Sequence, residues 1–139
     1  AICFSADRKC AYFTDTPTRQ IMRQPLNGAG WPTGSAEVFI DLNKQGLNPD
    51  GAVIDAEGCL WNAQWGASRV ARYSPEGREL MHIDMPALQT TCPAFGGPDL
   101  TTLFVTSAAE GMNNPSEVQG QTFSVQPEHK GLAEHRVII

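Results

Sequence analysis

The sequence has no long apolar run and no excess of positive charge. No apolar stretch approaches the roughly 20 residues that a membrane-spanning helix needs, so a transmembrane protein is not expected. Ten lysine and arginine residues stand against 15 aspartate and glutamate residues, which gives a net charge of −5. Because proteins that bind duplex nucleic acid usually carry a basic stripe, neither nucleic acid nor a membrane is an expected partner.

The cysteines form no C-x-x-C pair, which argues against a structural zinc site and against a redox dithiol. Three of the four lie within apolar stretches, as buried free thiols do. The sequence Asn114-Pro115-Ser116 is not a usable glycosylation site because of its proline, and residues 1–10 show no secretory signal pattern. A reducing cytoplasm is therefore the expected location. The four cysteines are Cys3, Cys10, Cys59 and Cys92.

The composition is that of one globular domain of 139 residues, and its 13 glycines and 10 prolines favour tight turns over long helices. Short aromatic and β-branched runs between turn residues predict an all-β fold, which is a sandwich, a barrel or a propeller. Residues 108–120 are predicted to form a loop excursion or a helical turn. The predicted strands are 10–14, 37–41, 51–54, 59–65, 69–73, 79–85, 103–106 and 122–125.

A threefold internal repeat favours the propeller among these folds. Units of strand, acidic or glycine turn, and strand begin at Phe4, Ile54 and Phe95. Their spacing suits propeller blades, which repeat at roughly 40–50 residues, so the chain is expected to hold about three blades. Propellers usually close with about 4–8 blades, which predicts a fragment of a longer propeller or one chain of a closed assembly. A β-sandwich with accidentally similar hairpins is the alternative.

Several motifs follow one another in a specific order and spacing. They are Ile2–Ser5, Tyr12–Asp15, Pro49–Gly51, Asp55–Trp61, Gly66–Tyr73, Cys92–Leu100 and Leu103–Ser107. Together they resemble the gluconolactonase/regucalcin (senescence marker protein) family, over almost the whole chain apart from a loop around 28–34. The resemblance implies a six-bladed propeller with a divalent metal in its central channel, and hydrolysis of sugar lactones.

The resemblance also implies which residues hold the metal. Family members use a glutamate, an asparagine and the aspartate of a Pro-Asp-Gly motif, and the last of these corresponds to Asp50. The asparagine would fall immediately before Ala1 and the glutamate far upstream, so residues 1–139 resemble the C-terminal half of the family. Residues 131–136 resemble the family's usual ending. A missing N-terminal half, or a second copy of the chain, is then needed to close the propeller.

Lactone opening requires a polarised carbonyl group and a deprotonated water, and one divalent cation can supply both effects. A carboxylate that touches both metal and water can act as ligand and general base, so Asp50 is the candidate for both roles. Oxygen ligands suit Ca²⁺, Mg²⁺ or Mn²⁺ and tolerate Zn²⁺. The motif Pro49-Asp50-Gly51 alone favours a simple turn between two strands, and the order of the surrounding family motifs favours metal ligation instead.

Other polar and aromatic residues have weaker claims on function. Trp65 is a candidate to line a sugar pocket, with blade packing as the alternative. Asp15 and Asp55 are expected to cap or start turns, and Cys92 has no nearby histidine that would make it a nucleophile. The three histidines, His82, His129 and His135, show no metal-ligand spacing.

The leading function is thus metal-dependent hydrolysis of a sugar lactone. A non-catalytic calcium- or metal-binding propeller and a half-propeller interaction module are the alternatives. Fold alone does not choose among the three, because propellers serve all of them. Residues 110–120 are either a lid over the channel or, as the simpler interpretation, a plain surface loop.

Overall fold

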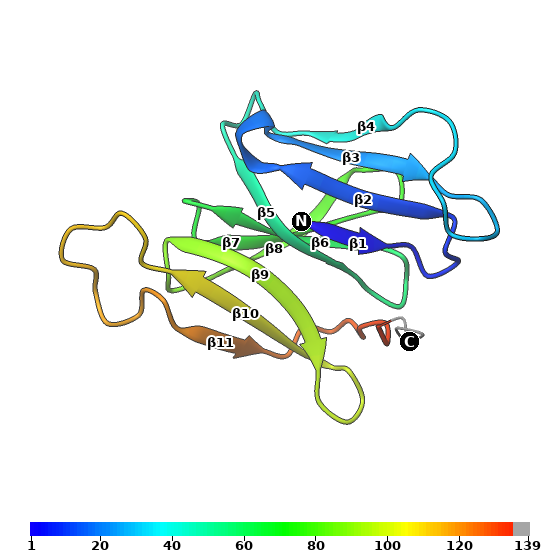
Figure 1. Cartoon of the computed structure of the whole chain (residues 1–139). Coiled ribbons are helices and arrows are strands. Elements are labelled where there is room, and N and C mark those ends of the chain that lie inside the picture. The colour runs from blue at the N-terminus through cyan, green and yellow to red at the C-terminus, as the bar shows by residue number, and fades with distance from the viewer. Residues whose placement is uncertain (135–139) are drawn as a thin grey trace.

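The computed structural model describes residues 1–134 and consists of antiparallel β-strands with one short 3₁₀ turn, η1 (Thr16–Thr18). The strands form three blades that lie side by side (Figure 1). The first blade is β1 (Ile2–Phe4), β2 (Cys10–Asp15), β3 (Gln20–Pro25) and β4 (Glu37–Asp41). The second is β5 (Asn48–Ile54), β6 (Leu60–Trp65), β7 (Arg69–Tyr73) and β8 (Glu79–Asp84). The third is β9 (Gln89–Gly96), β10 (Thr102–Ala108) and β11 (Thr122–Val125).

Within each blade, strands that are consecutive in sequence pair in antiparallel fashion. A single bridge pair, Trp65 with Gln89, joins the second blade to the third. This meander arrangement confirms the all-β propeller prediction and the count of three blades. All eight predicted strands are present with bounds that shift by up to three residues, and β1, β3 and β9 are additional.

β5 and β9 are the first strands of the second and third blades, and each contains a proline. Pro49 lies in β5 and Pro93 in β9, and each of these strands has a regular ladder partner on one side only. Proline cannot donate to a ladder, so it is tolerated in such edge positions and weakens the sequence signal for a strand. This explains why β9 had no predicted bounds and why β5 was predicted three residues too short.

Two apolar cores fill the interfaces between neighbouring blades. The core between the first and second blades contains Tyr12, Ile21, Leu42, Leu60 and Tyr73. The core between the second and third contains Trp61, Val70, Leu103 and Val105. The second blade is therefore buried on both faces, which explains the nearly continuous burial of β6 and β7.

The thiols are less buried than the sequence predicted. All four cysteines are free, but only Cys59 is fully buried, and Cys92 is exposed. The expectation of three buried thiols is wrong, because Cys3 and Cys10 are only partly buried. No helix within residues 1–134 is long and apolar enough to cross a membrane.

The segment after β11 returns across the second and third blades (Figure 1). The Ala56 N–H donates to the Lys130 carbonyl at 2.9 Å, and Gly131 forms a bridge pair with Asp55. The Gly131 N–H donates to the Leu100 carbonyl at 2.7 Å, so this segment contacts both blades. Residues 108–120 form the end of β10 and a loop of turns, and no helix is found there.

Candidate active site

Asp50 lies at a β-bulge in β5. The pairing of β5 with β6 jumps from Pro49–Gln64 to Ala52–Asn62, so Asp50 and Gly51 together oppose the single residue Ala63. Bulges bend a strand and re-aim its side chains, and they are common next to active sites. The interpretation of Pro49-Asp50-Gly51 as a turn between strands is wrong, because all three residues belong to β5.

Gly51 allows β5 and β9 to approach each other at the bulge. A β-carbon at Gly51 would lie 2.5 Å from the Thr91 carbonyl oxygen and 2.6 Å from both Cα and Sγ of Cys92. These distances are too short for any side chain, so glycine is required here. The first strands of the second and third blades therefore meet beside Asp50.

Burial raises the pKa of the Asp50 carboxyl group above its ordinary value of 3.8. The Gly51 N–H acts in the opposite direction. The strand that carries Asp50, β5, lies in contact with β1.

One thiol, that of Cys92, lies beside Asp50, and another, that of Cys3, lies on β1, which contacts β5. Cys92 is exposed as a residue, but partial desolvation of its thiol raises the pKa of Cys92, and the Asp50 carboxylate raises it further. Burial, followed by the charge of Glu134, raises the pKa of Cys3 to about 12. Since the thiolate is the nucleophilic form, neither cysteine is prepared to attack a substrate, in agreement with the reading of Cys92 from the sequence.

Within residues 1–134, no three His, Cys, Asp or Glu side chains gather closely enough to hold an ion. Asp50 offers one hard carboxylate ligand of the kind that Ca²⁺, Mg²⁺ or Mn²⁺ prefers. A site with several carboxylate or imidazole ligands would therefore need residues beyond the described ones.

Trp65 ends β6 at the seam between the second and third blades. Its backbone pairs with Asn48 and with Gln89, and its side chain is partly buried. The Asn48 amide also donates to the Trp65 carbonyl at 3.5 Å. Trp65 therefore lies on the strand next to the one that carries Asp50.

The two other aspartates that the sequence analysis considered, Asp15 and Asp55, have structural contacts of their own. Asp15 is exposed and precedes η1, where its carbonyl accepts a hydrogen bond from Thr18 Oγ1. Asp55 starts the turn between β5 and β6, as predicted, with the Gly58 N–H donating to its carbonyl at 3.0 Å. The Asp55 side chain is fully buried and forms an ion pair with Arg72 at 2.8 Å, which the sequence did not suggest.

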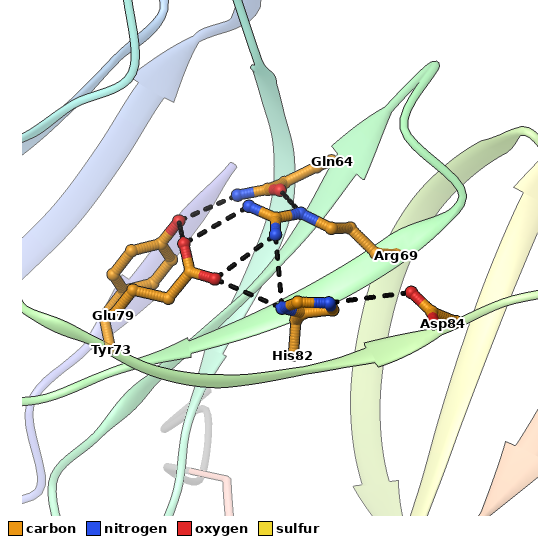
Figure 2. Close-up of polar contacts among 6 residues, drawn as sticks. All are labelled: Gln64, Arg69, Tyr73, Glu79, His82 and Asp84. Carbon is orange, nitrogen blue, oxygen red and sulfur yellow. Dashed lines mark hydrogen bonds and ion pairs between the residues drawn. The ribbon is translucent and has the colours of Figure 1, made fainter. Parts of the chain in front are cut away.

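The histidines serve surface and interblade contacts. Figure 2 shows His82 in a polar network along the second blade, 3.3 Å from the Glu79 carboxylate and 3.7 Å from Asp84. The buried Tyr73 hydroxyl belongs to the same network, and burial raises its pKa to about 12. His129 lies 3.0 Å from the Glu57 carboxylate. His135 lies outside the described residues.

Sequence reasoning missed Asn62, which pairs with Ala52 next to the bulge. Its side-chain amide donates to the carbonyls of both Asp50 and Gly51 at 3.1 Å. A polar residue inside a buried stretch of β6 was the only available signal, and its partners are 11 and 12 residues away in the sequence. The site therefore consists of Asp50 on a bulge held between β6 and β9.

Known proteins resemble this chain over nearly all its length. Residues 1–109 match the family model for the SMP-30/Gluconolactonase/LRE-like region. The chain is 39% identical to 6-deoxy-6-sulfogluconolactonase of Pseudomonas putida, over 96% of this chain and 47% of that protein. It is 35% identical to L-arabinolactonase of Azospirillum brasilense, over 98% of this chain and 46% of that protein.

A solved structure supports the same relationship. A protein from Agrobacterium tumefaciens described as calcium-binding protein, regucalcin, superposes with a TM-score of 0.90 at 45% identity. The match covers 96% of this chain and 47% of that one. The chain thus spans about half the length of the curated relatives it matches.

Proposed function

Since the chain belongs to the SMP-30/Gluconolactonase/LRE-like family, we propose that the protein containing it hydrolyses a sugar lactone. The observation that carries this proposal is the run of named lactonases 33% to 39% identical over 96% or more of the chain. The placement of Asp50, partly buried on a bulge of a strand that contacts β1, supports it. The particular sugar is left open, because those relatives are named for different lactones.

Asp50 is the proposed general base. Its carboxylate would accept a proton from water, and the resulting hydroxide would add to the lactone carbonyl carbon. The ring C–O bond then breaks, and the proton passes to the departing ring oxygen to give a hydroxy acid. Partial burial raises the pKa of the Asp50 carboxyl group, which increases the basicity of its carboxylate.

Asp50 is also the proposed ligand of one divalent cation, either Ca²⁺, Zn²⁺, Mg²⁺ or Mn²⁺. When bound, such a cation supplies polarisation of the carbonyl group and a lowered pKa of water. The further ligands would come from the part of the protein that precedes Ala1. Trp65 is proposed to contribute an aromatic face to the sugar pocket.

The remaining part of a six-bladed propeller is proposed to cover the outer face of the first blade. The exposed side chains on or beside this sheet include Ile2, Phe13, Trp31 and Val38. A sheet with apolar residues on both faces is normally covered on both. We propose that the chain is the C-terminal half and that the N-terminal half closes the ring. A native mass of two identical chains would show instead that a second copy of this chain closes the ring.

A non-catalytic metal-binding propeller is the second candidate, because the structural relative from Agrobacterium is described as a calcium-binding protein. Only the lactonase would turn over a lactone substrate, whereas a metal-binding propeller without catalysis would not. The full-length protein should hydrolyse an aldonolactone, and both chelation and Asp50→Asn should reduce kcat by at least about 100-fold. Asp15→Asn, a matched change at an exposed carboxylate, should leave kcat intact. Turnover that survives Asp50→Asn would exclude this mechanism.

A further inference from the structure

The bulge that carries Asp50 is held by a side chain from the neighbouring strand. We propose that Asn62 is a positioning residue, which fixes Asp50 by donating hydrogen bonds to the backbone of the bulge. The inference rests on the proposed role of Asp50. It concerns how the carboxylate is held and adds no group that touches the substrate.

The geometry provides two donors for two acceptors. The bulge places two residues of β5 opposite one residue of β6, so the regular ladder is interrupted at Asp50 and Gly51. Buried carbonyl groups need donors. The Asn62 Nδ2 group lies 3.1 Å from both carbonyl oxygens and supplies both hydrogen bonds.

The orientation of the Asn62 amide follows from these contacts. If the amide were reversed, Oδ1 would face two carbonyl oxygens, which also carry negative partial charge. In the observed orientation, Oδ1 is buried and has no hydrogen-bond partner among residues 1–134. An unpaired buried acceptor destabilises a protein, and leucine would fill a similar volume without one. Leucine would lack the two N–H donors that bind the carbonyl groups of Asp50 and Gly51. The two hydrogen bonds to the bulge therefore explain why an amide occupies this position.

The bulge is held from two sides. On one side it meets Asn62 of β6. On the other, Gly51 lies against the Thr91 carbonyl and Cys92 of β9. Loss of the Asn62 amide would free the backbone on one side only, so the bulge should loosen while the blades remain packed. The Asp50 carboxylate would then sample positions away from the substrate.

Gln64 provides a matched control on the same strand. Like Asn62 it is a side-chain amide with 0% exposure. Its amide donates to the Tyr73 hydroxyl at 2.8 Å and accepts from Arg69, as Figure 2 shows, and neither partner belongs to the bulge. Replacement of Gln64 removes a buried amide of comparable cost without changing the hydrogen bonds to Asp50 and Gly51.

The test compares Asn62→Leu with Gln64→Met in the full-length protein. For Asn62→Leu, kcat on an aldonolactone should fall by about 10- to 100-fold with KM changed less than about threefold, as expected for a misplaced base. Amide hydrogen exchange at Gly51 and Ala52 should accelerate at least tenfold. Gln64→Met should leave kcat and these two exchange rates within about threefold of the parent.

The two readouts separate this inference from the proposed function. Unchanged exchange at Gly51 and Ala52 in Asn62→Leu, or equal acceleration in Gln64→Met, would overturn it. If Asp50→Asn proves fully active, the proposed role of Asp50 as base and ligand fails, while the exchange rates still decide whether Asn62 holds the bulge. Should Asn62→Leu not fold, Asn62→Ser retains one hydroxyl donor and should shift exchange in the same direction by a smaller factor.

Discussion

Gly51 faces Cys92 so closely that a methyl group on its α-carbon would lie 2.6 Å from the cysteine sulfur. The same methyl group would lie 2.5 Å from the Thr91 carbonyl oxygen, which is backbone and has little freedom to move. β5 and β9 therefore depend on glycine at this point. Because Gly51 belongs to the bulge, a change here should affect both stability and the position of Asp50.

Gly51→Ala should lower the free energy of unfolding by about 1–3 kcal/mol, as overpacking of a filled interior does. It should also lower lactonase activity, because the bulge must shift to relieve the clash. Urea unfolding and steady-state kinetics check these effects. Gly28→Ala is the control, since a β-carbon at Gly28 would meet nothing within 4 Å. Equal stability of the two variants would contradict the close approach.

The bounds of a strand next to a clear turn could be predicted from the sequence, and the position of the bulge could not. Arg69–Tyr73 was assigned correctly to the residue, because the turn sequence Ser74–Gly77 follows it, although its alternating polar and apolar residues are almost all buried. Pro49-Asp50-Gly51 has turn composition but lies inside β5. Its conformation depends on Asn62 and Cys92, which are distant in sequence.

The candidate site was only partly visible for the same reason. Asp50 was proposed from family resemblance, whereas no local pattern distinguishes Asn62 from a polar residue that faces solvent. Asp55 was expected at a turn and is found there. Its burial against Arg72 requires β7 to lie beside β6, which is a tertiary relationship.

Asp55→Asn should be among the most destabilising single changes in the chain. The Asp55 carboxylate is 0% exposed and accepts hydrogen bonds from Arg72 Nε at 2.8 Å and Trp61 Nε1 at 2.9 Å. The substitution leaves the buried guanidinium group with only the exposed carboxylate of Glu57 as a charge partner, and breaking such a buried pair costs about 3–5 kcal/mol. Chemical denaturation provides the measurement.

The exposed pair of Arg23 and Glu37 is the control for that prediction. Glu37 lies on the surface of the first blade, and its contacts with Arg23 include a hydrogen bond of 2.9 Å. Solvent screens such a pair, so Glu37→Gln should change the free energy of unfolding by less than about 1 kcal/mol. Similar losses for both substitutions would mean that burial does not strengthen the Asp55–Arg72 pair.

The contact between His129 and Glu57 should make stability depend on pH in acid. The hydrogen bond from His129, followed by that from Arg72, lowers the pKa of Glu57 from its ordinary value of 4.5. Folding therefore favours the ionised carboxylate, and the unfolded chain binds more protons in this range. The stabilisation is complete above pH 4.5 and is lost as the pH falls through the lowered pKa.

Thermal unfolding between pH 3 and pH 6 tests this dependence, a window of about three units around the ordinary glutamate pKa. His129→Gln should reduce the acid slope, because it removes the largest cause of the lowered pKa of Glu57. His82→Gln alters a histidine in a separate network and should preserve the slope. An identical slope in parent and His129→Gln would show that the contact does not influence folding.

Gly131 should control whether the C-terminal segment stays docked between the second and third blades. A β-carbon at Gly131 would lie 2.1 Å from Cβ and 2.3 Å from Cγ of Phe95, so Gly131→Ala cannot keep the present packing. The Ala56 N–H, which donates to the Lys130 carbonyl, should then exchange at least about tenfold faster. Tryptic cleavage after Lys130 should accelerate with it, whereas Gly28→Ala should change neither rate. If cleavage accelerates while Ala56 stays protected, the segment has loosened only beyond Lys130, and Gly131 would not be its anchor.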